Sequence, residues 1–183
     1  MLNGKTVLVV GAAGLIGAEI AEEVYRQNGR LIIADINSGR AKDIAAKFNE
    51  ENRVCHASLD FTSEKSFDSL FKFLEHKKWD VDALVVSAYP QRGMLMDVNN
   101  TTYSTFCEAI NLHLGGYYLS IKRMIEYLKA KNREGCVVSV SSISQCASPN
   151  ATTVLITLGP AITAASPFAI PSPARSTSRC STA

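Results

Sequence analysis

Three glycines at three-residue steps, Gly11, Gly14 and Gly17, are the residues whose spacing most clearly indicates chemistry. In a dinucleotide-binding turn the first glycine permits the tight turn, the second lets the backbone approach a pyrophosphate, and the third lets helix and strand pack closely. If a helix opens here, its first N–H groups and its dipole can hold the phosphate charge. The spacing therefore predicts a pyrophosphate site that includes Leu15 and Ile16, with a ligand-free glycine turn as the alternative.

An acidic residue, Asp35, ends the next apolar run, about 20 residues beyond the glycines. There its carboxylate can accept hydrogen bonds from ribose hydroxyls. The same negative charge would repel a 2′-phosphate, and no arginine immediately follows it, since the nearest is Arg40. We therefore expect NAD as the cofactor rather than NADP.

Strands and helices must alternate to position these residues. Residues 7–10 are apolar throughout, which is typical of a strand buried on both faces, and the helical spacing that follows predicts a helix from within the glycine stretch. Further strands are expected at 30–34, 54–57, 83–87 and 136–141. Asn28 and Gly29 are expected to end the first helix. Further helices are expected after a cap at Ser38, from residues 63–64, and over about 102–131. This alternation predicts an α/β fold with a doubly wound parallel sheet.

The composition of the chain changes at about Pro149. Residues 150–183 contain no Asp, Glu or Lys, and mostly comprise Ala, Ser, Thr and Pro. Residues 152–158 could form one more strand, but nothing after them has helical periodicity. We predict a dinucleotide-binding domain over 1–148, a sheet truncated after its fifth strand, and an irregular, disordered tail over 149–183. A reading-frame change near Pro149 and a genuine divergent C-terminus are the two explanations.

Charge and cysteine usage narrow the function classes. The net charge of +2 is spread along the chain without a basic block, which argues against nucleic acid or a membrane surface as partner. No apolar stretch reaches the roughly 18 residues of a membrane span. The five cysteines lack CxxC spacing, so we expect reduced thiols, no metal site and a cytoplasmic location.

Taken together, these units resemble the short-chain dehydrogenase/reductase family, which has a Rossmann-type fold, over residues 5 to about 145. The glycine spacing is similar to a G-x-x-G-x-x-G variant of the family's motif. The resemblance places Asp60 where an acid contacts the adenine ring, and Ala88 is what remains of the family's Asn-Asn-Ala-Gly motif at 86–89. The Ala-Tyr-Pro sequence at 88–90 is similar to that of a subgroup that acts in bacterial flagellin and surface-sugar modification.

The resemblance also implies two catalytic residues. Asn111 matches the Asn that locally opens a helix and holds a proton-relay water. Ser142 matches the Ser just past the fifth strand, whose hydroxyl contacts the reacting oxygen. The alternatives are a helix-surface amide for Asn111 and a turn residue for Ser142.

The family's Tyr-x-x-x-Lys pair should follow Ser142, because its Tyr needs an adjacent ammonium to act as acid/base at neutral pH. No Tyr lies beyond Tyr127 and no Lys beyond Lys131. Tyr118 and Lys122 have the spacing but precede the fifth strand, so we interpret Tyr118 as an ordinary packing residue.

The resemblance therefore implies a hydride transfer between NAD(P) and a small-molecule substrate with a hydroxyl or carbonyl group, with sugars as one substrate class, in a chain that is catalytically impaired. The alternatives are a non-catalytic nucleotide-binding or partner-binding protein that keeps only the cofactor half, and a product that does not fold stably. In the family the Asn-bearing helix packs across subunits, which implies a homo-oligomer formed through the helix of Asn111.

Overall fold

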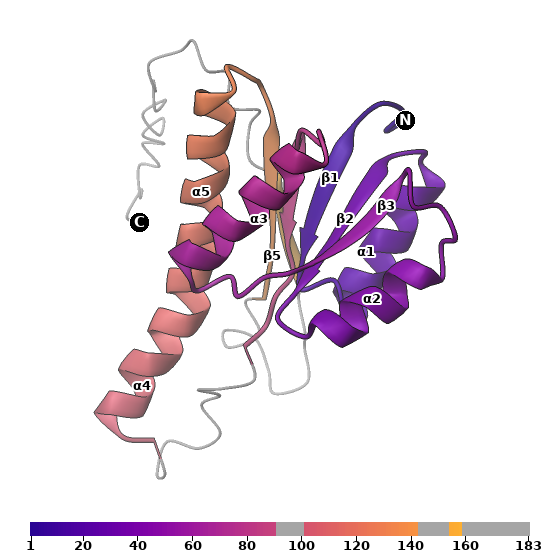
Figure 1. The fold of residues 1–183 in the computed structure, drawn as a ribbon. Coiled ribbons are helices and arrows are strands. Elements are labelled where there is room, and N and C mark those ends of the chain that lie inside the picture. Colours follow the sequence, from indigo (N-terminus) through magenta and orange to yellow (C-terminus); the bar gives the residue numbers. More distant parts are fainter. Residues whose placement is uncertain (91–100, 143–153, 159–183) are drawn as a thin grey trace, which may run out of the picture.

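A parallel sheet forms the centre of the molecule (Figure 1). The computed structural model describes residues 1–90 and 101–142 with their fold, and the strand backbone of 154–158. The parallel strands are β1 (Thr6–Val10), β2 (Arg30–Asp35), β3 (Val54–Ser58), β4 (Ala83–Val86) and β5 (Cys136–Ser142). Their order is β3-β2-β1-β4-β5, with parallel pairing throughout. The predicted doubly wound α/β fold is confirmed.

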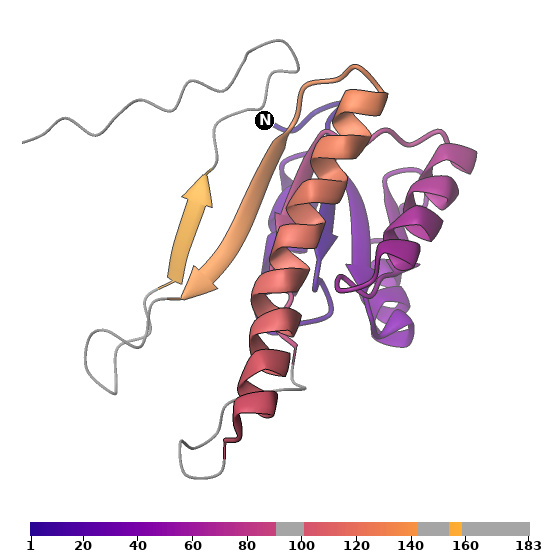
Figure 2. The same ribbon diagram turned by 90° about the vertical axis from the view of Figure 1, so that its left-hand side faces the viewer.

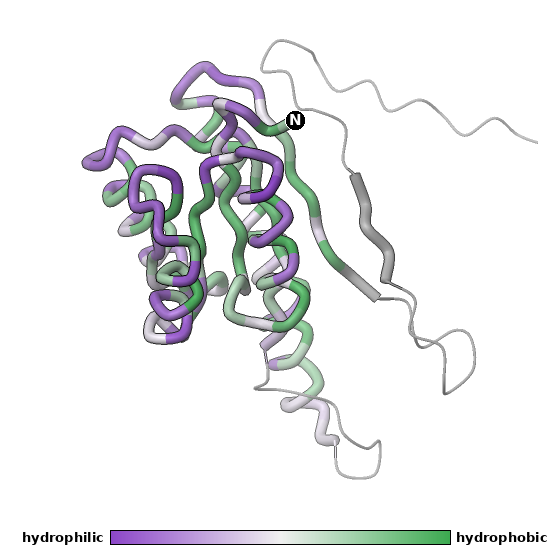
Figure 3. Tube along the Cα trace, turned by 90° about the vertical axis from the view of Figure 1, so that its right-hand side faces the viewer, coloured by the Kyte–Doolittle hydropathy of each residue, from purple (hydrophilic) through white to green (hydrophobic). Residues whose placement is uncertain are grey.

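Helices cover both faces of this sheet, as Figure 1 shows. They are α1 (Leu15–Arg26) and α2 (Ser38–Ala46) on one face, and α3 (Glu64–His76) and α5 (Gly116–Ala130) on the other. Successive strand residues point to opposite faces, so Val7 and Val9 pack with α1 and α2, whereas Leu8 and Val10 pack with α3 and α5. This two-sided burial explains the hydrophobic strands in Figure 3.

The helix boundaries follow local side-chain chemistry. Asn28 has φ +62° and the Gly29 N–H donates to the Val24 carbonyl at 3.0 Å, so the predicted stop of α1 is confirmed. Ser63 caps α3 as expected. The predicted cap of α2 at Ser38 is wrong by one residue, because the Asn37 side chain accepts from the Arg40 N–H at 3.0 Å.

The long helical region expected over about 102–131 is present, but its winding changes in the middle. It comprises α4 (Tyr103–Ile110), a π-helical turn η2 (Asn111–Gly115) and α5, which follow one another along one column in Figure 2. A π-turn inside an α-helix often marks a functional position. Within the described part of the chain, no helix has the length and apolar character needed to cross a membrane.

The sheet does not end at its fifth strand. Residues Val154–Leu158 form β6, which pairs antiparallel with β5 (Figure 2). The connection, residues 143–153, is shorter than the dozen or more residues that a parallel crossover needs, so the strand returns antiparallel. The strand that residues 152–158 could form is thus present, and the predicted truncation after the fifth strand is wrong. The domain boundary at 148–149 and the remaining tail lie outside the described residues, and their predictions stand untested.

Asp82 joins the starts of three strands at the amino edge of the sheet. Its carboxylate accepts from the Thr6 N–H at 2.8 Å and from Arg133 at 2.8 Å, and lies 3.5 Å from the Lys5 ammonium. Its backbone N–H donates to the Thr6 carbonyl, and its carbonyl accepts from Cys136. The Asp82 side chain is only 12% exposed, so these bonds are made largely away from water.

We expect Asp82→Ala to lower the free energy of unfolding by about 2–3 kcal/mol, because the buried Thr6 N–H and the Arg133 charge both lose their acceptor. Asp82→Asn retains an acceptor for Thr6 and should lower it by about 1 kcal/mol. Chemical denaturation measures both values. Equal losses for the two variants would assign the effect to the ion pair with Arg133 and not to the Thr6 hydrogen bond.

Candidate functional site

The strand order reverses between β1 and β4, and the turns that follow these two strands meet at the carboxyl edge of the sheet. The Ser87 N–H donates to the Val10 carbonyl at 2.9 Å, and the Gly11 N–H donates to the Ala34 carbonyl at 2.9 Å. Ligands of open α/β sheets bind at such a reversal, outside the carboxyl ends of the strands. The structure thus brings the glycine turn, Asp35, Asp60 and Ala88 to the ends of four adjacent strands.

The fold itself requires two of the three glycines. Gly11 has φ +77°, and a Cβ there would lie 2.5 Å from both the Cα and the N of Ala88. A Cβ at Gly17 would overlap the Gly11 carbonyl and would lie 2.8 Å from the Ala12 Cα. Both positions are therefore closed by backbone, whether or not a ligand binds.

Gly14 differs from the other two. Its φ is −81°, and a Cβ there would meet only the Gly11 carbonyl oxygen, at 3.3 Å. No side chain caps the N-terminus of α1, and the first turn carries no acidic residue. Leu15 is 90% exposed and Ile16 is 49% exposed, so the surface around these helix N–H groups is open. The folded chain alone does not require glycine at this position.

The Asp35 carboxylate is already engaged by backbone. One oxygen accepts from the Ala13 N–H at 3.0 Å and the other from the Asn37 N–H at 2.9 Å. Because a carboxylate has about four acceptor positions, two remain for a ligand. Asp35 therefore has a structural part, holding the glycine turn against the end of β2, that the sequence analysis did not anticipate.

Asp60 is held in a similar way. Its Oδ1 accepts from the N–H of Thr62 at 2.9 Å and from its hydroxyl at 2.7 Å, and the Asp60 N–H donates to Ser66 Oγ at 3.0 Å. These contacts fix the turn between β3 and α3. They place the carboxylate at the same sheet edge as Asp35.

A groove of about 300 Å³ lies between α1 and α2, beside the glycine turn. Gly14 and Leu15 line one side, and the basic residues Arg40 and Lys47 line the other, together with Asp43. Arg40 thus shares a groove with the glycine turn. Arg40 lies in the first turn of α2, which begins three residues after Asp35, whereas Lys47 caps the other end of the same helix.

Asn111 and Ser142 are positioned by different elements. Asn111 opens the π-turn η2 and is exposed, and the next residues of this turn approach the loop after β4 through an edge contact between the His113 and Tyr89 rings at 4.8 Å. Ser142 is the last residue of β5, not a residue just past it, because its backbone pairs with Val154 of β6.

Tyr118 is not a packing residue, contrary to our expectation. It is 67% exposed, and the Lys122 ammonium is 3.9 Å from Glu64 and 3.8 Å from Glu126. Neighbouring helical residues lie about 100° apart, so Tyr117 and Tyr118 cannot both face the sheet.

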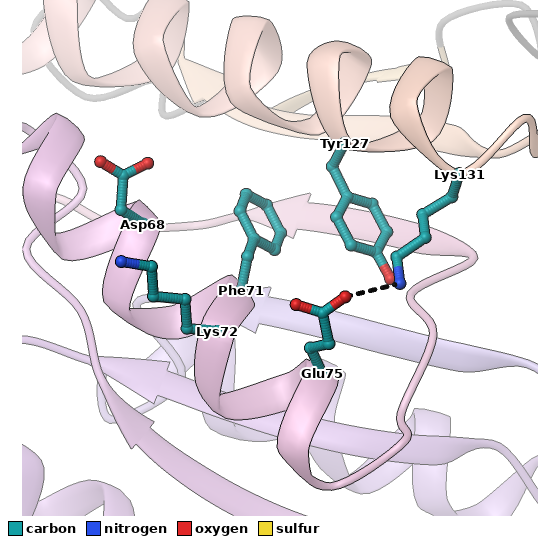
Figure 4. A pocket seen from close by; sticks show the side chains of 6 residues that line it. All are labelled: Asp68, Phe71, Lys72, Glu75, Tyr127 and Lys131. Carbon is teal, nitrogen blue, oxygen red and sulfur yellow. Dashed lines mark hydrogen bonds and ion pairs between the residues drawn. The ribbon is translucent and has the colours of Figure 1, made fainter.

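A second Tyr-x-x-x-Lys spacing, Tyr127 to Lys131, was missed by the sequence analysis. The two residues line a pocket of about 220 Å³ between α3 and α5, with the Tyr127 ring stacked on Phe71 at 4.6 Å (Figure 4). The Lys131 ammonium lies 3.4 Å from Glu75, and the Tyr127 hydroxyl accepts from the Val81 N–H at 3.2 Å.

This pair does not suit acid/base chemistry with Ser142. Val81 precedes β4, so the pair lies at the amino edge of the sheet, opposite the glycine turn. Burial raises the pKa of Tyr127, whereas a tyrosine that serves as acid/base at neutral pH needs a lowered one. The spacing alone therefore does not identify an active site.

The order of the parallel strands and the helices on both faces define an α/β fold of the Rossmann type. A family model described as short chain dehydrogenase matches residues 5–154, and the chain belongs to this family. Membership implies a nicotinamide cofactor, NAD or NADP.

One relative is post-translational flagellin modification protein A from Campylobacter coli, which is 29% identical over 78% of this chain and 57% of that protein. Another is sorbitol dehydrogenase from Cereibacter sphaeroides, which is 28% identical over 77% of this chain and 54% of that protein. A crystal structure of sorbitol-6-phosphate 2-dehydrogenase from Erwinia amylovora matches in fold, with a TM-score of 0.67 and 21% identity over 76% of this chain and 54% of that one. The chain thus spans little more than half the length of these relatives.

The two kinds of glycine lead to a stability prediction. Gly17→Ala should lower the free energy of unfolding by about 2–3 kcal/mol, because its Cβ meets backbone that cannot move aside. Gly14→Ala should change it by less than about 1 kcal/mol, since its Cβ meets one carbonyl oxygen at 3.3 Å. Urea unfolding of both variants tests this, and a large loss at Gly14 would mean that the fold requires this glycine too.

Proposed function

We propose that this chain binds a nicotinamide dinucleotide at the carboxyl edge of its sheet and belongs to an oxidoreductase that transfers a hydride between NAD and a hydroxyl or carbonyl group. The observation that carries this proposal is Gly14. It is a glycine that the fold does not require, at an uncapped helix N-terminus between two glycines that the fold does require. Close approach of a pyrophosphate supplies the missing reason.

In this proposal each site residue has one part. The glycine turn holds the pyrophosphate, Asp35 the ribose hydroxyls, Asp60 the adenine ring and Ala88 the other half of the cofactor. Asn111 orders a water for proton relay, and Ser142 contacts the reacting oxygen. The residues of the turn are Gly11, Gly14, Leu15, Ile16 and Gly17.

A sugar or sugar alcohol is the substrate class that we propose. Two relatives are named for sorbitol chemistry, a galactitol 2-dehydrogenase is 26% identical, and the relative from Campylobacter coli is named for flagellin modification. When bound, the cofactor would supply hydride exchange at its nicotinamide ring. The protein's part is to orient the substrate oxygen and to move its proton.

For that proton the chain has no suitable tyrosine after Ser142, since its last Tyr is Tyr127 and its last Lys is Lys131. Both Tyr-x-x-x-Lys spacings precede β5, and the described contacts of each engage its lysine with carboxylates. We therefore propose that the 183-residue chain binds the cofactor but turns over poorly. The same observation favours the second candidate function, a non-catalytic nucleotide-binding protein.

We also propose that the helix bearing Asn111 packs against a second copy of the chain. Four apolar side chains at four-residue steps lie exposed along α4, η2 and α5: Phe106, Ile110, Leu114 and Tyr118. Such a stripe is more extended than the scattered apolar residues of an ordinary surface. Sedimentation of the intact chain would test this, and a monomer at micromolar concentration would contradict it.

We predict that Gly14→Val weakens NADH binding at least about tenfold while leaving the unfolding temperature nearly unchanged, because its branched side chain fills the space of the pyrophosphate. Fluorescence titration and thermal unfolding measure the two effects. Unimpaired NADH binding by Gly14→Val would remove the main support of the proposal. Turnover of sugar alcohols with NAD then separates an active enzyme from a binding protein.

We predict that the chain prefers NADH to NADPH by about tenfold or more, because the Asp35 carboxylate repels a 2′-phosphate. Asp35→Asn should narrow the preference, since the amide keeps one side-chain oxygen that can accept from a backbone N–H but loses the negative charge. Arg40→Ala is the matched variant, and should weaken NADPH binding further without changing that of NADH. Equal or tighter NADPH binding by the unmodified chain would contradict the assignment.

A further inference from the structure

We propose that the Tyr117 hydroxyl is a positioning group that fixes the loop after β4 to the end of β5 and so shapes the half of the crevice that takes the nicotinamide. This inference rests on the proposed function. It assigns a part to a residue that neither the glycine turn nor the Asn111 and Ser142 match explains.

The hydroxyl lies between two backbone carbonyls, one in the loop after β4 and one in β5. It donates to the Val140 carbonyl at 2.6 Å and lies 3.2 Å from the Ala88 carbonyl, so a single proton faces both acceptors. Ala88 comes two residues after β4 ends, and Val140 comes two residues before Ser142. One side chain therefore connects the loop after β4 to the end of β5.

The sheet itself does not make this connection. The parallel ladder between β4 and β5 ends at the pair Val86 and Ser139. Among the described residues no backbone hydrogen bond is seen between the two segments beyond this pair, and Ala88 lies against Gly11 instead. The Tyr117 hydroxyl continues the connection at the level where the ladder stops.

The Tyr117 ring is itself held in place. It makes an edge contact with Phe61 at 6.1 Å, and Phe61 follows the cofactor-side residue Asp60. A Cβ at Gly116 would lie 2.8 Å from two carbons of the Phe61 ring, so α5 comes this close only because residue 116 is glycine. The packing thus aims the hydroxyl at the two carbonyls.

The protonation state of the Tyr117 hydroxyl agrees with a positioning role. Burial raises the pKa of Tyr117, so the hydroxyl stays protonated and donates at neutral pH. It therefore acts as a hydrogen-bond donor and not as an acid/base. Its effect on the site acts through the positions of Ala88 and of the end of β5.

Position in the crevice decides which half of the cofactor responds. The glycine turn follows β1 and Asp35 ends β2, and in the proposed function these two hold the pyrophosphate and the adenosine. Tyr117 instead acts beyond β4. Removing its hydroxyl should weaken binding of the whole dinucleotide but not of ADP. A merely structural loss of stability would affect both ligands alike.

The experiment compares Tyr117→Phe with Tyr127→Phe in the full chain. Each variant removes one partly buried hydroxyl from α5, but Tyr127 lies at the opposite edge of the sheet, beside Val81. We expect Tyr117→Phe to raise the Kd for NADH about 3- to 10-fold, with the Kd for ADP within about twofold of the parent. Tyr127→Phe should leave both affinities unchanged.

Hydrogen exchange of the ligand-free chain gives a second readout. Tyr117→Phe should speed exchange in peptides covering 86–89 and 138–142, and Tyr127→Phe should speed it only around 79–82. If exchange at 86–89 and 138–142 is unchanged in Tyr117→Phe, or if ADP and NADH weaken equally, the inference is wrong. Failure of the unmodified chain to bind NADH would instead overturn the proposed function, and the exchange comparison would still decide the part of Tyr117.

Discussion

The contact between Gly11 and Ala88 is the constraint on which the rest of the site depends. The two turns lie so close that no Cβ fits at residue 11. This closeness follows from the parallel pairing of β1 with β4, which brings both turns to one edge with nothing between them. Since β1 and β4 are also where the strand order reverses, the same packing that completes the core forms the edge at which we propose that the cofactor binds.

The strands could be predicted from the sequence because burial on both faces leaves an uninterrupted apolar run, as in 7–10 and 31–34. Helix caps were less certain. Asn37 and Ser38 are both short polar residues that can accept from a backbone N–H, and only the backbone conformation decides between them. The direction of β6 depended on the length of its connection and not on its composition.

For the candidate site, residue types pointed to the glycine turn and Asp35 but not to the structural roles of these residues. Nothing in the sequence distinguishes the glycine that the fold does not require, Gly14, from the two that are closed by backbone. Likewise Tyr117 and Tyr118 are adjacent and chemically identical, yet Tyr117 connects the loop after β4 to β5 whereas Tyr118 faces solvent. Such differences arise from distances between segments far apart in the chain, which spacing patterns do not contain.

The exposed start of α1 has a thermodynamic consequence. Leu15 and Ile16 present apolar surface to water beside an uncapped helix end. A ligand that covered these side chains while it met the helix N–H groups would remove apolar surface from water together with a charge. Burial of apolar surface gives association a negative heat capacity change. The enthalpy of such binding becomes more favourable as the temperature rises, even though the contact that selects the ligand is electrostatic.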